Sequence, residues 1–291
     1  MVPTRYQRTI ATSAAVRGIG YWGGQDVCVE FRPAEPDTGI VFVRTDLAGF
    51  PRIGATMGNC APAALRTNLR SGVVAVDMVE HVMAGLAGLR IDNCEVWVDQ
   101  QEMPGCDGSS LPFVDALDAA GIVEQRAARR QKLINRTIRL GNGPSWIEAR
   151  PSWSEETILR YELDYGDGSP IGHQALEIVL SPESFRKELA ASRTFVSQAE
   201  AVAFQAQGLG RRATYQDLLV FGPRGPIDNE LRFADECVRH KLLDMVGDLA
   251  LTGCDLVGCV FAYRSGHQLN VELAQAAVAQ DGPLEGLKRC A

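Results

Sequence analysis

The chain has 291 residues, a length that favours two domains on a prior of roughly 150 residues per domain. Its composition, 46% hydrophobic and 22% charged, is globular and excludes disordered, collagenous and low-complexity classes. The formal net charge of -7, from 29 Lys plus Arg against 36 Asp plus Glu, provides no basic excess for a phosphate backbone. We therefore expect a protein with a sizeable core and no nucleic-acid partner.

Targeting and membrane signals are not visible in the sequence. The segment MVPTRYQRTIATSAAVRGIGYWGG lacks a basic region followed by a continuous apolar one, so no secretory signal is expected. The apolar stretch from Leu249 contains Asp255 and two glycines, and is shorter than the roughly 20 residues that a bilayer requires. We expect a cytoplasmic protein without a transmembrane segment.

The eight cysteines include no CxxC pair, and most lie in apolar runs such as VCVEF. In a cytosolic chain of this size, that pattern predicts small buried side chains rather than disulfides or ligands. They are Cys28, Cys60, Cys94, Cys106, Cys237, Cys254, Cys259 and Cys290.

Period-two alternation with β-branched residues predicts seven strands. In chain order they are DVCVEFRP from Asp26, GIVFVRTD from Gly39, CEVWVDQ from Cys94, WIEARP from Trp146, LRYELDY from Leu159, LEIVL from Leu176 and VGCVFAYR from Val257. Helical periodicity predicts helices over 76–89, 113–122, 181–192, 197–208 and 230–253. Because these elements do not alternate as a βαβ series, we predict an α+β fold with mostly antiparallel pairing.

A polar, strongly charged segment between Val123 and Lys132 separates two blocks of strands and helices. It predicts a boundary between an N-terminal α+β domain, residues 1–126, and a C-terminal α+β domain, residues 127–291. Each domain then carries part of the candidate site described below.

The two blocks also carry a weak repeat. His81 lies in a helix that leads to Cys94, and His240 lies in a helix that leads to Cys254, at separations that differ by one residue. A fixed spacing of this kind indicates related halves. If the halves face each other, the two histidines meet at their junction.

The predicted helix around His240 has a polar side. At about 100° per residue, four polar residues share one sector, opposite an apolar stripe. A histidine and a carboxylate four residues apart, as His240 and Asp244 are, can chelate one cation. The alternative is a solvated face with an i,i+4 ion pair. The four polar residues are His240, Lys241, Asp244 and Asp248.

The other candidate metal ligand is His81, preceded by Glu80. Adjacent helix positions point about 100° apart, so these two side chains cannot easily bind one metal. A His-His-Asp set leaves a fourth zinc position open for water, whose pKa the metal lowers to about 7. Glu80 could then act on that water as a general base.

Two further residues, His267 and Thr194, could complete a hydrolytic site together with Asp248. His267, in a Ser-Gly-His loop after a strand, could be a general acid if Asp248 kept it protonated. Thr194, in ASRTF, could donate a hydrogen bond to a developing oxyanion. The remaining histidine, His173 in SPIGHQ, is predicted to be a solvated loop residue.

Six segments, in order, resemble those of the zinc-dependent UDP-3-O-acyl-N-acetylglucosamine deacetylases of lipid A synthesis, the LpxC family. They run across nearly the whole chain, and VEH, RHKxLDxxGD and SGHxxN together are far more specific than any one alone. The segments are RPAEPDTGIVFVRTDL, VEHVMAGLAGLRIDN, EMPGCDGSSLPFVDAL, SRTF followed by QAQGLG, LRFADECVRHKLLDMVGDL and AYRSGHQLN.

The resemblance implies two β-α-α-β domains, with the helices sandwiched between two sheets and the site between the domains. It implies Zn²⁺ as the cofactor and assigns roles to the residues that match the family's motifs. These are His81, His240 and Asp244 as zinc ligands, Glu80 as general base, His267 as proton donor oriented by Asp248, and Thr194 as oxyanion donor.

For the substrate, the resemblance implies that Lys241 and Arg264 meet the sugar or diphosphate, with Arg264 where the family usually has lysine. Phe195 and Tyr165 would line the substrate site, and Tyr165 matches an aromatic position associated with uridine. These residues predict a UDP-linked acylated amino sugar as the ligand.

The chain departs from the family pattern around the substrate. Trp22, in GIGYWGG, stands where histidine is usual, and Ser145 stands where a basic residue is usual. After QAQGLG, Arg211 and Arg212 interrupt a glycine-rich segment, and Asp217 stands roughly where asparagine is expected. The acyl and nucleotide sites are therefore altered, whereas the metal and acid-base residues are intact.

We predict a zinc-dependent amide hydrolase that releases acetate from UDP-3-O-acyl-N-acetylglucosamine in lipid A biosynthesis. One alternative is deacetylation of a different N-acetyl sugar, because the acyl-binding segment has diverged. Another is a non-catalytic paralogue that binds zinc and sugar nucleotide. We expect a monomer, with at most transient association with a membrane surface.

Overall fold

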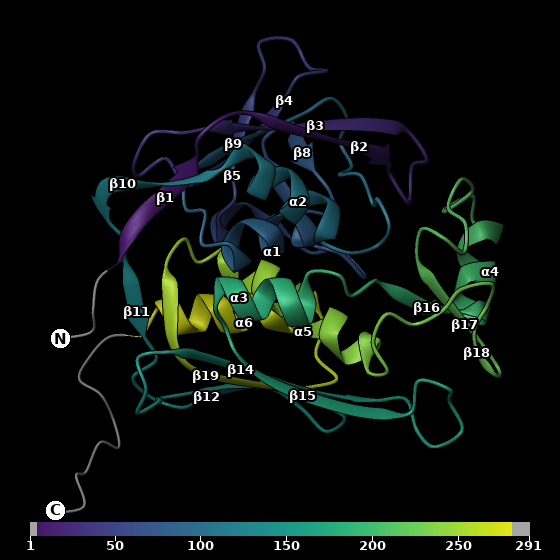
Figure 1. Ribbon diagram of the computed structural model, residues 1–291. Helices are drawn as coiled ribbons and strands as arrows, with labels where there is room; N and C mark the ends of the chain where they lie inside the picture. The colour runs from purple at the N-terminus through teal and green to yellow at the C-terminus, as the bar shows by residue number, and fades with distance from the viewer. Residues whose placement is uncertain (1–4, 281–291) are drawn as a thin grey trace, which may run out of the picture.

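The computed structural model describes residues 5–280, so Cys290 lies outside the described part of the chain. Two main β-sheets face each other, and helices fill the space between them (Figure 1). The fold is α+β, as the sequence predicts. Within residues 5–280, no helix is long and apolar enough to span a membrane.

The N-terminal sheet has the strand order β2-β3-β9-β4-β5, in which only β4 and β9 are parallel. Alternation along β3 buries Val27, Val29 and Phe31, and the Phe31 ring meets Phe113 of α2 edge to face. The strands are β2 Ala14–Ile19, β3 Asp26–Pro33, β4 Ile40–Arg44, β5 Arg52–Gly54 and β9 Cys94–Val98.

The C-terminal sheet has the order β12-β13-β19-β14-β15, in which only β14 and β19 are parallel. A short strand, β11, pairs in parallel with the start of β19. The strands are β11 Gln131–Leu133, β12 Ile138–Asn142, β13 Ser145–Arg150, β14 Thr157–Asp164, β15 His173–Val179 and β19 Asp255–Tyr263.

The two sheets share one topology. In each, the last strand along the chain, β9 or β19, is inserted between the second and the third. Each inserted strand follows a helix that carries a candidate metal ligand, His81 or His240. This shared connectivity supports the repeat predicted from the two histidine spacings.

The charged segment at the predicted domain boundary forms a strand. β10 (Ile122–Ala128) runs across position 126 and pairs antiparallel with β1 (Tyr6–Ile10). The linker is therefore tied to the start of the chain rather than left free. The division into residues 1–126 and 127–291 stays a prediction.

Two small sheets complete the fold. One of them, with α4, forms a separate group at the right of Figure 1, where the predicted acyl-binding insert lies. The first sheet comprises β6 Cys60–Ala61, β7 Asn68–Ser71 and β8 Val74–Val76, and the second comprises β16 Phe195–Ser197, β17 Leu219–Gly222 and β18 Gly225–Pro226.

Each of the five predicted helical regions overlaps a helix, and one helix, α6, was not predicted. The Ser-Gly-His loop assigned to His267 is wrong, because His267 is the first residue of α6 and Gly266 is its extended N-cap. The helices are α1 Glu80–Gly88, α2 Leu111–Ala120, α3 Pro182–Ser184 with a π-helical turn Phe185–Leu189, α4 Gln198–Ala206, α5 Glu236–Ala250 and α6 His267–Val278, with a 3₁₀ turn at Met57–Asn59.

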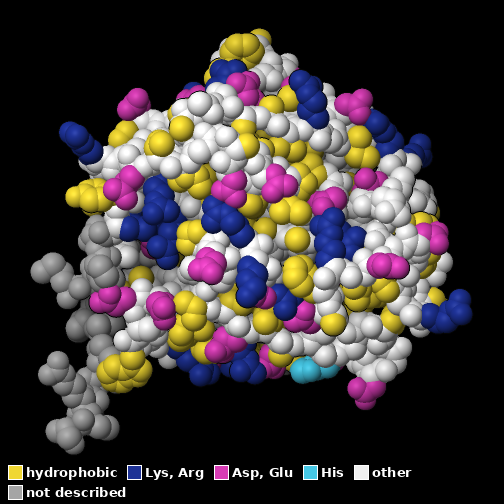
Figure 2. Space-filling model, viewed as in Figure 1, with side chains coloured by type: hydrophobic (Ala, Val, Ile, Leu, Met, Phe, Trp, Pro, Cys, Tyr) yellow, Lys and Arg dark blue, Asp and Glu magenta, His cyan; other side chains and the backbone are white. Residues whose placement is uncertain are grey.

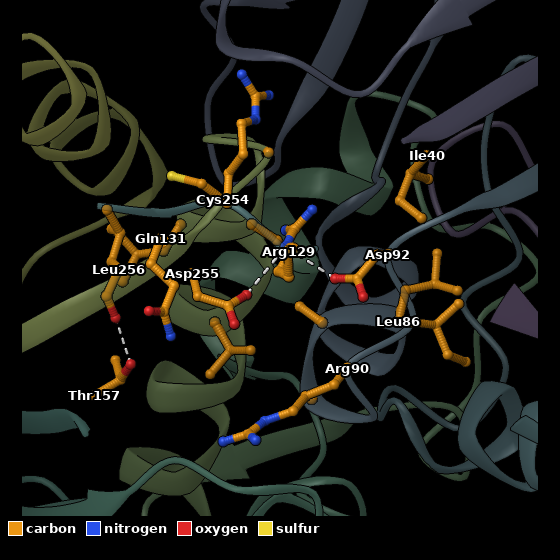
Figure 3. Close-up of a pocket in the computed structure, with 18 of the residues that line it drawn as sticks. Ile40, Leu86, Arg90, Asp92, Arg129, Gln131, Thr157, Cys254, Asp255 and Leu256 are labelled. Carbon is orange, nitrogen blue, oxygen red and sulfur yellow. Dashed lines mark hydrogen bonds and ion pairs between the residues drawn. The ribbon is translucent and has the colours of Figure 1, made fainter. Parts of the chain in front are cut away.

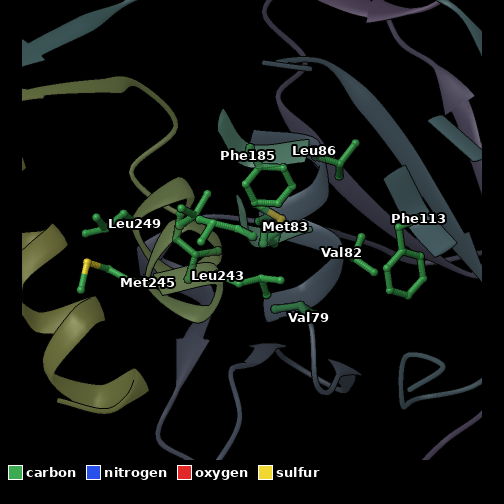
Figure 4. Packing of buried hydrophobic residues seen from close by; sticks show 14 of the residues in the cluster. Val79, Val82, Met83, Leu86, Phe113, Phe185, Leu243, Met245 and Leu249 are labelled. Carbon is green, nitrogen blue, oxygen red and sulfur yellow. The ribbon is translucent and has the colours of Figure 1, made fainter. Parts of the chain in front are cut away.

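Helices α1 and α5 pack closely at the centre of the molecule. Figure 4 shows Met83 and Leu86 of α1, Leu243 of α5 and Phe185 in one apolar cluster, and all four side chains are buried. Burial of each such side chain contributes about 1.5–3 kcal/mol to folding. Gly247 permits the approach, since a Cβ added there would lie 2.2 Å from the carbonyl oxygen of Glu80.

Gly247→Ala is expected to lower the free energy of unfolding by about 1–3 kcal/mol, because an added methyl group in a packed core forces backbone shifts. Gly85→Ala on α1 is the matched control. Its added Cβ would make ordinary contacts, the nearest at 3.6 Å from Phe113, and should be neutral or stabilising. Urea unfolding of the two variants measures the difference, and an unchanged midpoint for Gly247→Ala would contradict the packing argument.

Candidate active site

Three side chains from the two central helices form a buried cluster of nitrogen and oxygen donors. His81 comes from α1, and His240 and Asp244 come from successive turns of α5. One ligand atom from each lies within 4.8 Å of the others. Asp244 Oδ1 is 3.2 Å from His240 Nε2 and 3.7 Å from His81 Nε2. Sequence reasoning placed these residues at one site, and the fold brings them together.

Hydrogen bonding orients His240 so that its Nε2 faces Asp244. His240 Nδ1 lies 3.1 Å from the carbonyl oxygen of Ser192, which can only accept, so Nδ1 is the donor in this contact. His240 Nε2 lies 3.2 Å from Asp244 Oδ1, which is buried and has no hydrogen-bond partner among the described residues. A metal ion beside these atoms would give the buried oxygen a partner, so the cluster suits a metal ion.

The charges of the cluster favour the metal-binding protonation states. Burial and the neighbouring His240 lower the pKa of His81 to about 3, so its ring is neutral. Burial disfavours ionisation of Asp244, but His240 and Lys241 outweigh it and hold the pKa of that carboxyl well below its usual range. Lys241 Nζ donates to Asp244 Oδ2 over 2.6 Å. Neutral imidazole and ionised carboxylate are the forms that bind metal ions.

A buried ion pair holds the segment that leads to Thr194. The Arg193 guanidinium donates to both carboxylate oxygens of Glu236, at 2.8 and 3.1 Å, and Glu236 is fully buried. The same segment supplies the Ser192 carbonyl that orients His240. Thr194 then follows with its backbone N–H donating to the Gly108 carbonyl over 2.8 Å. The Arg193–Glu236 pair therefore couples the metal cluster to the predicted oxyanion donor.

Glu80 lies beside the cluster at the first position of α1 and is only 3% exposed. Burial raises its pKa to about 7, against the opposite effect of His267. The backbone N–H of Thr67 donates to Glu80 Oε2 over 2.9 Å and fixes one carboxylate oxygen. A buried carboxyl group that titrates near neutrality is suited to general-base chemistry.

His267 and Asp248 form a hydrogen-bonded pair on the other side of the cluster. His267 Nδ1 donates to Asp248 Oδ2 over 2.9 Å, and His267 Nε2 lies 3.9 Å from Asp244 Oδ2. Burial alone would lower the pKa of His267, but Asp248 outweighs it and raises the pKa to about 9. His267 is therefore protonated at neutral pH, as a proton donor must be.

Two supporting residues were missed by sequence reasoning. Thr67 Oγ1 donates to Asp248 Oδ1 over 2.6 Å and lies 3.2 Å from His267 Nδ1. Asn270 Nδ2 donates to Asp248 Oδ2 over 2.8 Å, and Ser265 Oγ donates to Asn270 in turn. Asn270 stands in the SGHxxN motif and could have been found there, whereas no local pattern marks Thr67.

The cluster opens into a cavity of about 1230 Å³. Its lining includes Thr194 and all four residues predicted for the substrate. The Phe195 ring lies 6.4 Å from the His240 ring and 6.0 Å from the ring of Tyr165, which is 47% exposed. The four are Lys241, Arg264, Phe195 and Tyr165. The predicted site residues other than Asp248 line one cavity, and Asp248 is fully buried behind His267.

Comparison with known proteins gives the family. The family model described as LpxC: UDP-3-O-acyl N-acetylglycosamine deacetylase matches residues 7–279. The chain belongs to the LpxC family. Proteins named UDP-3-O-acyl-N-acetylglucosamine deacetylase in Brucella ovis, Brucella canis and Brucella suis are each 38% identical over 282 residues, 96% of this chain and 98% of the relative. The resemblance predicted from the six segments is confirmed.

In this LpxC-family chain, two residues that depart from the family pattern, Trp22 and Arg212, make contacts between the insert and the N-terminal half. The Trp22 ring meets Phe204 of α4 edge to face at 5.2 Å, and the Arg66 guanidinium lies 4.7 Å from the Trp22 ring. Arg212 donates to the Gly24 carbonyl and to Asp26, which ties the insert to the N-terminal sheet. Trp22 and Phe204 both line the active-site cavity. One departure from the family pattern, Trp22, therefore lies in the cavity wall beside the insert.

Proposed function

We propose that this LpxC-family chain is a zinc-dependent hydrolase that removes acetate from UDP-3-O-acyl-N-acetylglucosamine in lipid A biosynthesis. The observation that carries the proposal is the placement of Glu80 and the His267–Asp248 pair beside a buried His-His-Asp cluster in one large cavity. The names of the Brucella relatives supply the substrate. We also propose that the protein is cytoplasmic and monomeric.

The donor set of His81, His240 and Asp244 fits zinc. Two imidazole nitrogens and one carboxylate oxygen leave a fourth position open, as catalytic zinc sites do. Asp244 Oδ1 lies 3.2 Å from His240 Nε2 and 3.7 Å from His81 Nε2, so these three residues are close enough to hold one zinc ion together. When bound, Zn²⁺ supplies Lewis-acid polarisation of the acetamide carbonyl and makes water more acidic.

Glu80 and Thr194 act on the carbonyl side of the amide. Glu80, ionised and held by the Thr67 N–H, accepts the proton of the attacking water. As the carbonyl oxygen becomes an oxyanion, the Thr194 hydroxyl donates a hydrogen bond to it. The tetrahedral intermediate is thus stabilised by groups that are in place before reaction.

His267 acts on the nitrogen side. Its Nδ1 proton is committed to Asp248, so its Nε2 proton is the one available for the departing amine. Protonation of the nitrogen allows the C–N bond to break, which releases acetate and the free amino sugar. Lys241 and Arg264 meet the sugar or diphosphate, while Tyr165 and Phe195 line the site.

Acetate release by the purified chain tests the proposal. Zinc-loaded protein is expected to release acetate from UDP-3-O-acyl-N-acetylglucosamine at least about tenfold faster than from UDP-N-acetylglucosamine, because acyl burial adds binding energy. Absence of release from the acylated substrate would contradict the assignment. Faster release from the non-acylated substrate would favour a different N-acetyl sugar.

Thr67→Val tests the support of the acid-base pair. The substitution keeps the N–H that holds Glu80 and removes only the hydroxyl that binds Asp248, so kcat should fall about tenfold with little change in KM. Thr67→Ser, which retains the hydroxyl, should restore kcat. Thermal midpoints and zinc content monitor folding. An unchanged kcat for Thr67→Val would show that the Thr67 hydroxyl does not support the His267–Asp248 pair.

A further inference from the structure

A second cavity, here called the seam cavity, lies between the two sheets and shares no lining residue with the active site. Its volume is about 900 Å³, and both halves of the chain line it (Figure 3). Ile40 and Ala87 from the N-terminal half and Leu180 and Leu256 from the C-terminal half give it apolar walls. The proposed deacetylation uses none of these residues.

Most buried charge in the seam cavity is neutralised within a four-residue network. Arg5 donates to Asp92 and Asp255, with both shortest contacts at 2.7 Å. Arg129 contacts the same two carboxylates, at 2.9 and 3.1 Å, as the dashed lines in Figure 3 mark. Two positive and two negative groups satisfy one another. This network joins the halves and leaves no charge for a ligand.

Arg90 differs from these arginines. It follows the end of α1 with φ of 57°, a left-handed conformation that favours glycine. Its side chain is half-buried in the lining and has no hydrogen bond or ion pair within residues 5–280. Burial and the nearby Arg5 lower the pKa of its guanidinium, which records an unfavourable environment for the charge. Figure 3 shows Arg90 extending apart from Arg129 and Asp92.

A half-buried cation without a counter-ion, next to apolar walls, is complementary to an amphipathic anion. The rim carries the acids Asp37, Glu155 and Glu156 as well as Arg130, but all four are exposed. Solvent screens these exposed charges more strongly than that of Arg90. On the face drawn in Figure 2, basic, acidic and apolar side chains intermingle across the middle band.

We propose that the seam cavity binds a small amphipathic anion, with its anionic group on Arg90 and its apolar part against Ile40, Leu180 and Leu256. Such a ligand would contact both halves at a site that shares no lining residue with the active-site cavity. It would therefore stabilise the folded protein by binding across the seam. The site is independent of the proposed deacetylation, and its test does not measure activity.

Three probes separate the charge from the apolar part: octyl phosphate, inorganic phosphate and 1-octanol. Calorimetric titration of the full zinc-loaded chain should give a Kd for octyl phosphate on the order of 0.1 mM, the range expected for a ligand of this size. The other two probes should bind at least about tenfold more weakly, because each lacks one of the two contacts. Inorganic phosphate or octanol binding as tightly as octyl phosphate would overturn the amphipathic site.

Arg90→Gln locates the binding. It should weaken octyl phosphate at least about tenfold, since a charge-assisted contact is lost. Arg8→Gln, at a nearby arginine outside the lining, is the control and should weaken binding far less than Arg90→Gln, because Arg8 acts on the site only through its charge at a distance. Thermal midpoints without probe verify folding, and Arg90→Gly, which suits the positive φ, provides a second variant that lacks the cation. Undiminished binding by both Arg90 variants would place the probe elsewhere, for example in the active-site cavity, and overturn the proposal.

Discussion

Replacing His240 with alanine is expected to remove bound zinc and to lower acetate release by at least about 1,000-fold. The imidazole supplies one of only three protein donors, and its Nε2 lies 3.2 Å from Asp244 Oδ1. Without it, two donors remain, too few for a catalytic zinc site. Elemental analysis of the purified variant measures the metal, and acetate release measures the activity.

His173→Ala is the matched control for that substitution. His173 was predicted in a loop; it begins β15 instead, but it is exposed and outside the active-site lining. It should retain both metal and activity. If His240→Ala kept stoichiometric zinc, or if both variants lost it equally, the assignment of the His-His-Asp cluster would be wrong.

His267→Ala is expected to slow turnover by about 100-fold to 10,000-fold, the usual contribution of a positioned general acid. Zinc should stay bound, because His267 contacts the cluster only through Asp244, at 3.9 Å. Metal analysis beside single-turnover kinetics separates the two effects. Loss of stoichiometric zinc in this variant would show that His267 is a ligand rather than the proton donor.

The pH dependence of kcat/KM tests the same pair of roles. The base must be ionised, so the rate rises as Glu80 loses its proton; burial raises the pKa of Glu80 to about 7. The acid must be protonated, so the rate falls as His267 loses its proton; despite burial, Asp248 raises the pKa of His267 to about 9. A bound cation lowers both values, so we expect a bell-shaped profile whose alkaline limb disappears in His267→Ala.

The metal cluster was predictable where the spacing lies within one helix. His240 and Asp244 are four residues apart, and that spacing alone places both side chains on one face of α5. His81 could be joined to them only through the motif resemblance, because its distance from α5 depends on helix packing. Gly247 sets that distance through its contact with the Glu80 backbone, a long-range relation with no local signal.

The parts that were not predicted share a dependence on tertiary contacts. Helix α6 was missed because its N-cap is Gly266 rather than Ser, Thr, Asp or Asn, and its buried positions begin only at Asn270. Thr67 joins Glu80 to Asp248, and Asp248 lies 181 residues after Thr67 in the chain. The charged linker forms β10 only because β1 lies beside it. The helix or strand propensity of a segment does not depend on the residues, distant in sequence, that it will contact in the fold.

Zinc titration of the chelated protein tests the central claim most directly. Chelator-treated chain should release no acetate from UDP-3-O-acyl-N-acetylglucosamine, and activity should return in proportion to added Zn²⁺ up to about one ion per chain. That result requires the buried His81, His240 and Asp244 cluster, to which both halves contribute. Full acetate release by protein shown to be free of metal would contradict the account.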